Sequence, residues 1–257
     1  ERCIKMEKID FVILWVDGSD SHWLKEKNMY APAQKDYSSG ANRFREWDNL
    51  HYWFRGVEKY APWVNSIYFI TWGHYPDWLN TAHPKLKIIN HNEYIPDKYL
   101  PTFNSNTIEL NLHRIKELSE NFILFNDDMF IIDHTTPNMF FENNNPKDEF
   151  VLNTILPIGE KGGIAYTNIN NTSIINKYYN KNKVVKNNFF KIYNLKYGKN
   201  LIRNILLMPW GVFVGFRNPH LATSHKKTTF SRVWNLEGQL LENTCQNKFR
   251  GTNDLSH

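Results

Sequence analysis

Residues 100–134 constrain the fold more than any other stretch, because they read in succession as a loop, a helix, a strand and an acidic turn. Residues 106–118 carry apolar side chains at helical intervals and predict a helix. The apolar run at residues 121–125 then leads directly into Asp127 and Asp128. Ligands of open α/β sheets bind at the carboxyl ends of the strands, so a site is expected at these carboxylates.

The predicted helix has one polar face. Asn106 and Glu109 have the spacing of a helix cap, which places the start of the helix near Asn106. At roughly 100° per residue, Asn106, Glu109 and His113 lie together on a face away from the apolar stripe. The helix is therefore expected to have a polar face opposite its buried stripe.

Three more apolar runs predict strands, at residues 9–16, 66–72 and 86–90. Residues 43–60 lie between the first two runs and place apolar side chains on one face of a helix. Strand, helix, strand and strand in this order predict an α/β fold with a mostly parallel sheet.

The middle of the chain is less regular. Residues 138–204 are rich in Asn and Lys, and we expect them to form an insertion or a lid within a single domain that spans residues 1–257. Residues 184–197 fit an amphipathic helix or a lid, and residues 227–234 predict a further helix.

The first strand stops at an acidic glycine turn that contains Asp17, Gly18 and Asp20. Glycine lets the backbone approach a ligand closely, and the carboxylates can accept ribose hydroxyls or hold a cation. An ordinary turn is the alternative. His220 follows an Asn-Pro pair, and by itself such an imidazole is more often structural than catalytic.

The charge balance favours an anionic partner. The formal net charge is +5 and the isoelectric point is near 9.0, which fits a nucleotide diphosphate, a charged polymer, nucleic acid or a membrane surface. Nucleic acid is the weakest of these, because Lys and Arg are spread out and no recognition motif is present.

The chain has two cysteines, Cys3 and Cys245, and no Cys/His cluster at zinc spacing. A reducing compartment or simple disuse explains this pattern. No apolar stretch approaches the roughly 18 residues that a membrane span needs.

The order of these signals resembles the Stealth family of sugar-1-phosphate transferases. These include bacterial capsular polysaccharide phosphotransferases and the Golgi N-acetylglucosamine-1-phosphotransferase. The resemblance rests on IDFVILWVDGSDSHWL at residues 9–24, RFREWDNLHYWFRGVEKYAPWVNSIYFITWG at residues 43–73, PDWLN, and the stretch from residue 100 to 128. PHLATSHKKTTFSRVW at residues 219–234, with NKFR after it, looks like the third conserved region.

Two departures from the family pattern stand out. Asn49 and His51 replace the usual Glu and Arg of the second block, so no role is carried over to these positions. The family's fourth region, which carries another acidic residue, is not evident before His257.

The resemblance implies a single catalytic domain with a nucleotide-sugar-transferase-like fold, of GT-A or Rossmann-like type. The implied reaction moves sugar-1-phosphate from a UDP-sugar to a hydroxyl of a polysaccharide or glycan acceptor and releases UMP. The sugar would be an N-acetylhexosamine or a hexose. Bacterial relatives of this kind act in the cytoplasm as peripheral proteins at the inner face of the membrane.

The resemblance also implies roles for the charged residues. Asp127 and Asp128 would hold Mg²⁺ or Mn²⁺, because hard ions prefer oxygen ligands. His220 is the candidate base, with Asp128 as its rival. Arg43 and Arg114 would balance phosphate charge, or else form surface ion pairs.

The remaining candidates would contact the substrate. The first group lines the nucleotide pocket: Asp17, Gly18 and Asp20. The second group either shapes the sugar subsite or holds the acidic turn in place: Asn104, Ser105, Glu109 and His113.

Two other functions use the same features. A UDP-sugar glycosyltransferase would need the same acidic turns and metal but would release UDP. A noncatalytic domain that binds carbohydrate or a polyanion would fit the 15% aromatic content and the basic charge.

Overall fold

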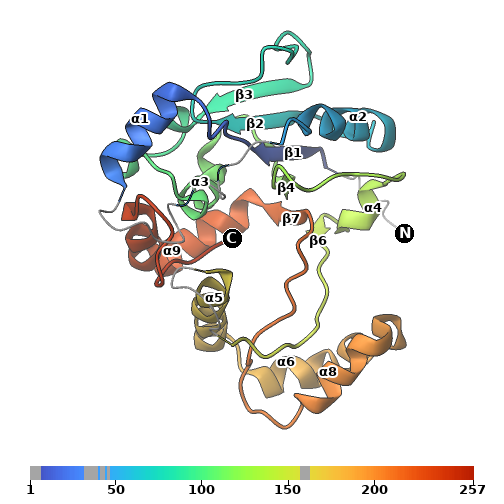
Figure 1. Cartoon of the computed structure of the whole chain (residues 1–257). Helices are drawn as coiled ribbons and strands as arrows, with labels where there is room; N and C mark the ends of the chain where they lie inside the picture. Colours follow the sequence, from blue (N-terminus) through green and yellow to red (C-terminus); the bar gives the residue numbers. More distant parts are fainter. Residues whose placement is uncertain (1–6, 32–39, 41–43, 45–46, 157–162) are drawn as a thin grey trace.

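The computed structural model describes residues 7–31, 40, 44, 47–156 and 163–257. Its centre is a five-stranded sheet in the order β3-β2-β1-β4-β7 (Figure 1). The strands are β1 (Ile9–Leu14), β2 (Ile67–Thr71), β3 (Leu86–Asn90), β4 (Asn121–Phe125) and β7 (Thr223–Lys226). The first four are parallel and β7 runs antiparallel to β4, which confirms the predicted mostly parallel α/β sheet.

Alternate side chains of the central strands enter two cores. Phe11 and Ile13 of β1 pack with α2 (Leu50–Tyr60), whereas Val12 enters the core on the opposite face of the sheet. That second core includes side chains from α3 (Ser105–Leu110) and α9 (Lys227–Gln246). Strands covered on both faces have continuous apolar sequences, which is why the sequence pattern located them so closely.

Helix α2 begins later than predicted. Residues 47–49 are not helical, because Asp48 has φ of 52°, in the left-handed region that interrupts a right-handed helix. Trp47 consequently is 65% exposed instead of joining the apolar face. Of the predicted stretch before Trp47, residues 43, 45 and 46 lie outside the described residues, and Arg43 is among them.

Helix α3 ends at Leu110, so the prediction of a continuous helix over residues 106–118 was wrong. The side chain of Asn111 donates to the carbonyl of Thr107 at 2.8 Å, and the chain continues as a 3₁₀ turn, η4 (Leu112–Arg114). The cap is Asn104, two residues before the predicted one. The apolar residues of the stripe still reach the core.

The middle of the chain forms α5 (Ile164–Tyr178), α6 (Lys181–Asn187), α7 (Phe189–Ile192), η5 (Leu195–Asn200) and α8 (Leu201–Leu206). Helix α5 lies beside α9, whereas α6 and α8 lie together at a distance from the sheet (Figure 1). The prediction of one helix over residues 184–197 was therefore wrong, since α6 ends before Asn188, whose side chain donates to the carbonyl of Val184. Helix α9 starts where predicted but continues twelve residues beyond 234, to Gln246.

The remaining elements are short. They are α1 (Ser21–Tyr30), η2 (His91–Glu93), η3 (Asp97–Tyr99), α4 (Pro137–Phe140), β5 (Phe141–Glu142) and β6 (Asn145–Pro146). Within the described ranges, no helix combines the length and the apolar character required to cross a bilayer. Cys245 is a buried free thiol, and Cys3 lies outside the described residues.

Candidate functional site

The sheet has a topological switch point between β1 and β4. From β1 the chain builds β2 and β3 on one side, and β4 then pairs with β1 on the other. Such a switch opens a crevice at the carboxyl ends of the two strands, where ligands of open α/β sheets bind. Ile13 pairs with Phe125, so the two acidic turns leave the sheet at the same level.

The first turn is ordered by its own carboxylates. Asp17 accepts hydrogen bonds from the amide and the hydroxyl of Ser19 at 2.8 and 2.6 Å. Asp20 accepts from the amide of Trp23 at 2.7 Å and caps α1, and this bond lowers the pKa of Asp20. Both residues therefore have structural partners in the turn, and their predicted contact with the nucleotide stays a prediction.

His74 supports the first turn from the end of β2. The amide of Asp17 donates to His74 Nε2 at 2.8 Å, so this nitrogen is an acceptor. Burial lowers the pKa of His74, against the opposing charges of Asp20 and Asp17. A neutral imidazole thus connects the ends of β1 and β2, a role that the sequence did not indicate.

Gly18 is required by a close approach within the protein. A Cβ at this position would lie 1.9 Å from the carbonyl oxygen of Phe44. The space that the sequence assigned to a ligand's approach is thus occupied on this side by main chain.

The second turn meets His220. Nε2 of His220 lies 3.0 Å from both carboxylate oxygens of Asp128, although the residues are 92 positions apart. The pairing of Leu124 with Thr223 explains the contact, because it places the loop before β7 beside the turn after β4. The side chains of His220 and Asp128 are 63% and 60% exposed, so a substrate can reach the pair.

The acidic turn fits a hard divalent cation whose coordination shell is completed by oxygen atoms of the substrate. No group of three or more His, Cys, Asp or Glu side chains with metal-binding geometry occurs among the described residues. Mg²⁺ commonly takes only one or two carboxylates and completes its shell with phosphate oxygens and water. Asp127 and Asp128 supply that number, and the exposed carboxylate of Asp128 leaves room for a hydrated ion.

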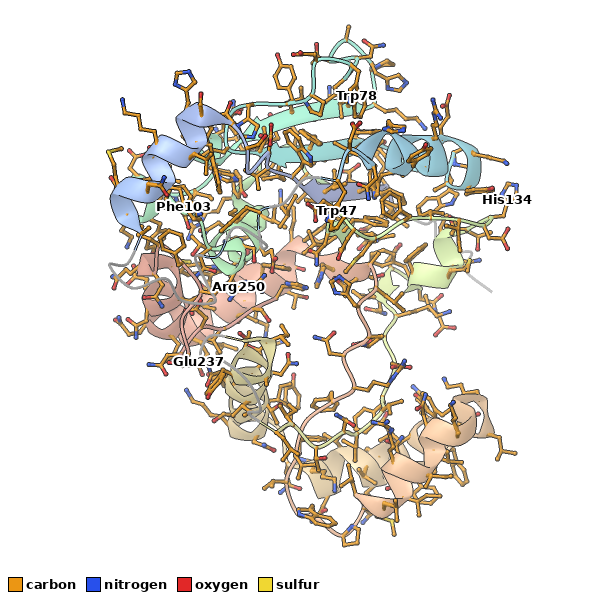
Figure 2. All side chains as sticks on the ribbon, in the orientation of Figure 1. Trp47, Trp78, Phe103, His134, Glu237 and Arg250 are labelled. Carbon is orange, nitrogen blue, oxygen red and sulfur yellow. The ribbon has the colours of Figure 1, made fainter. Side chains whose placement is uncertain are left out.

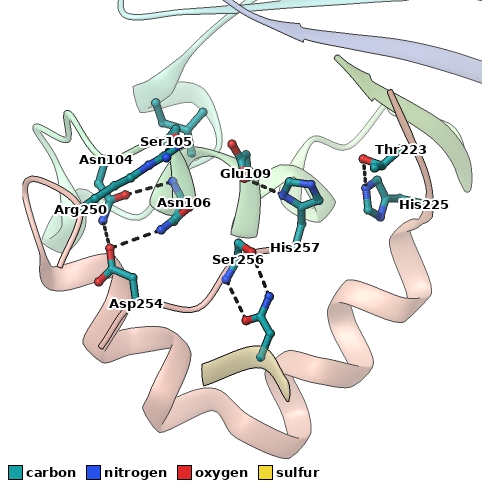
Figure 3. A network of polar contacts seen from close by, with 12 residues as sticks. Asn104, Ser105, Asn106, Glu109, Thr223, His225, Arg250, Asp254, Ser256 and His257 are labelled. Carbon is teal, nitrogen blue, oxygen red and sulfur yellow. Dashed lines mark hydrogen bonds and ion pairs between the residues drawn. The ribbon is translucent and has the colours of Figure 1, made fainter. Parts of the chain in front are cut away.

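The polar residues at the start of α3 hold the C-terminal segment, residues 250–257 (Figure 3). The side-chain amide of Asn104 donates to the carboxylate of Asp254 at 2.8 Å, and Nε of Arg250 donates to the hydroxyl of Ser105 at 3.0 Å. Glu109 pairs with Nδ1 of His257 at 2.6 Å.

These contacts join predicted binding residues to a segment that sequence reasoning did not connect with them. Asp254 and Glu109 are buried, whereas Arg250 is half-buried beside α3 and α9 (Figure 2). Helix α5 adds a further tie, because Asn170 donates to the carbonyls of Thr252 and Asp254 at 2.9 Å. No local signal could have revealed contacts across about 145 residues.

His113 and Arg114 face α9 instead of the acidic turns. The ring of His113 stacks on Phe230 at 6.2 Å, and burial, together with the charge of Arg114, lowers the pKa of His113 to about 4. Arg114 donates to Asn111 at 2.8 Å, and its guanidinium lies 5.0 Å from the ring of Trp234. The structure thus brings together Asp128 and His220. It places the other two predicted residues, His113 and Arg114, in the packing against α9.

The mostly parallel α/β sheet, with acidic turns at its switch point, is consistent with the nucleotide-sugar-transferase-like class of proteins. The particular family follows from comparison with known proteins. Residues 7–34 match Stealth conserved region 1 and residues 43–149 match Stealth conserved region 2. The chain belongs to the Stealth family, and the protein is therefore an enzyme, a phosphotransferase.

Similar proteins cover nearly the whole chain. Capsular polysaccharide phosphotransferase WcwK of Streptococcus pneumoniae is 47% identical, over 98% of this chain and 75% of its own length. Exopolysaccharide phosphotransferase cps2G of Lactiplantibacillus plantarum is 41% identical, over 96% of this chain and 72% of its own. Capsular polysaccharide phosphotransferase CpsJ of Streptococcus thermophilus is 39% identical, over 91% and 95%.

Proposed function

We propose that the protein transfers a sugar-1-phosphate from a UDP-sugar to a hydroxyl of a capsular or other cell-surface polysaccharide and releases UMP. The transferred sugar is an N-acetylhexosamine or a hexose. The pair formed by Asp128 and His220 at the switch point carries this proposal. It is supported by relatives whose names describe capsular and exopolysaccharide phosphotransferases.

The reaction breaks the bond between the bridging oxygen and the sugar-linked phosphorus. The acceptor hydroxyl attacks that phosphorus in line, the bridging oxygen leaves with UMP, and the hydroxyl proton must go to a base. The products are UMP and a phosphodiester between the sugar and the acceptor.

His220 suits the role of the base when Asp128 orients it. An ionised carboxylate that faces Nε2 at 3.0 Å accepts a hydrogen bond from this nitrogen. Nδ1 is then left as the proton acceptor, and the carboxylate stabilises the imidazolium that forms. Asp128 therefore acts on the imidazole, and it becomes the base itself only where the imidazole is absent.

A divalent ion would be held by Asp127 and Asp128. Mg²⁺ or Mn²⁺ would supply charge neutralisation on the two phosphates. A carboxylate has about four lone-pair sites, so Asp128 can contact His220 and still have capacity for another partner.

The test follows the phosphorus atom. The protein is incubated with UDP-N-acetylglucosamine that carries ³²P in the sugar-linked phosphate, with Mg²⁺ and a polysaccharide acceptor. Label in the polymer together with UMP supports sugar-1-phosphate transfer. Label that stays in UDP while the sugar enters the polymer identifies a glycosyltransferase, and donor binding without either product identifies a binding domain.

His220→Gln is the decisive variant, and His134→Gln is its matched control. His134 is an exposed imidazole near α4, at the periphery of the molecule (Figure 2). Loss of the base should reduce kcat by about 10²-fold to 10⁴-fold while donor binding is retained. Equal activity of the two variants would show that His220 is not the base of the reaction.

A further inference from the structure

Residues 181–212, here called the basic lobe, contain α6, α7, η5 and α8 and concentrate the positive charge of the chain. They carry six Lys, one Arg and no Asp or Glu, whereas the remaining residues have 24 Lys and Arg against 26 Asp and Glu. The basic net charge of the protein therefore comes from this one lobe.

The basic lobe also turns apolar side chains outward. On α8, Ile202, Ile205 and Leu206 recur at helical spacing and are 58%, 50% and 66% exposed. The buried position of the same helix is polar. Asn204 is fully buried, and its side-chain oxygen accepts a hydrogen bond from the backbone amide of Leu152 at 2.8 Å. This polarity is opposite to that of a helix on a water-soluble surface.

Neighbouring elements continue the exposed apolar surface. Phe190 of α7 and Leu195 of η5 are 85% and 87% exposed, and Trp210 follows α8 with half its surface accessible. Figure 2 shows side chains that project from the outer surface of this lobe. Exposed apolar patches of this kind mark sites of protein or membrane interaction.

The cations of the basic lobe are available to a partner. Lys183, Lys186, Lys191 and Lys199 are exposed, and none takes part in the ion pairs formed between described side chains. Lys181 is different, because it is buried and donates to the carbonyl of Leu207 at 2.7 Å. That bond ties α6 to the end of α8 and keeps the lobe together.

We propose that the basic lobe docks on an anionic membrane surface. Its Phe, Leu, Ile and Trp side chains enter the boundary between head groups and acyl chains, and its lysines contact acidic head groups. A soluble polyanion would use the lysines alone, whereas the outward apolar face of α8 favours a bilayer.

Docking would also bring the candidate site near the membrane. An extended segment, residues 213–222, leads from the lobe back to β7 of the sheet (Figure 1), and this segment carries His220. A membrane contact through the lobe therefore keeps the Asp128–His220 pair close to the bilayer. This inference names a partner beyond the proposed reaction and does not depend on which nucleotide is released.

The test is cosedimentation of the full chain with vesicles of phosphatidylcholine and phosphatidylglycerol, compared with vesicles of phosphatidylcholine alone. We expect binding to the anionic vesicles and a loss of at least tenfold in affinity without phosphatidylglycerol. Ile205→Ser with Leu206→Ser should weaken binding about tenfold, because apolar burial is lost. Each of Lys186→Ser and Lys191→Ser should weaken it about fivefold.

Matched controls lie on the sheet domain. Ile132→Ser removes a side chain that is 81% exposed, and Lys87→Ser removes an exposed cation of β3. Neither should change vesicle binding, and circular dichroism reports whether each variant folds. Three results would overturn the proposal: equal loss with the controls, tighter binding to dextran sulfate that is insensitive to the Ile205 and Leu206 changes, or a dimer in solution that these changes dissociate.

Discussion

Replacing Asp254 by Ala should destabilise the protein more than any other single change in the C-terminal segment. This carboxylate is fully buried and accepts from the side chains of Asn104 at 2.8 Å and Asn247 at 2.7 Å, and from the amide of Gly251 at 2.9 Å. Asn106 approaches it at 3.4 Å. Residues on α3, at the end of α9 and in the terminal segment thus share one acceptor.

The magnitude follows from the donors that lose their partner. Each buried donor left unpaired costs about 1 to 3 kcal/mol, and partial entry of water reduces the sum. A hydrogen bond to a charged acceptor contributes about 1.5 to 3 kcal/mol, so for three such bonds with partial rehydration we expect the free energy of unfolding to fall by about 4 kcal/mol. In a domain of this size, that corresponds to a decrease in Tm of about 10 °C.

Urea unfolding followed by circular dichroism measures this change. Asp77→Ala is the control, because Asp77 is an exposed carboxylate of the connection between β2 and β3. It should alter the free energy of unfolding by less than about 0.5 kcal/mol. A loss of less than about 1 kcal/mol for Asp254→Ala would refute the reasoning that this carboxylate organises the segment.

The remaining predictions concern catalysis, metal, pH and packing. Asp128→Asn should lower kcat about 10²-fold or more in the ³²P transfer assay while the protein stays folded. Chelation by EDTA should abolish transfer, and added Mg²⁺ or Mn²⁺ should restore it. Burial lowers the pKa of His91 to about 4 from 6.5, so its neutral form stabilises the fold above pH 6.5, and this stability is lost as the pH falls toward 4. Urea unfolding at pH 7 and pH 5 should differ by about 2 kcal/mol through this group, and His91→Gln should remove that part. Gly18→Ala should lower the free energy of unfolding by about 1 to 3 kcal/mol, because the new methyl meets the carbonyl of Phe44.

Each of these has a contradicting outcome. Ordinary turnover of Asp128→Asn at saturating metal would move the reaction away from the acidic turn, and undiminished transfer in EDTA would exclude a divalent ion. An unchanged acid dependence in His91→Gln would assign it to other groups. Gly211→Ala, where nothing lies within 4 Å of the added Cβ, is the control for Gly18→Ala, and equal effects would refute the close-approach argument.

The strands show what local sequence can predict. The runs that mark β3 and β4 coincide with the observed strands, and those of β1 and β2 exceed them by only one or two residues. A strand buried on both faces must be apolar at nearly every position, so its information is local. Helix ends were less accurate, since the side chain of Asn111 and the left-handed backbone of Asp48 stopped helices that the apolar spacing would have continued.

The candidate site divides in the same way. The acidic turns after β1 and β4 could be read from the sequence, because they follow buried strands whose carboxyl ends meet at one edge of a parallel sheet. The family resemblance and the phosphotransferase class were also evident at that level and are confirmed. The division of the chain into one catalytic domain with a lid stays a prediction.

Only the tertiary structure decided which distant groups meet. His220 reaches Asp128 because β7 pairs with β4, and Glu109 meets His257 because α9 returns the chain to α3. The apolar spacing of α8 did not predict that Asn204 would be buried and that Ile202, Ile205 and Leu206 would be exposed. Apolar periodicity reports only that a segment has two faces, whereas the packing of the rest of the chain decides what each face contacts.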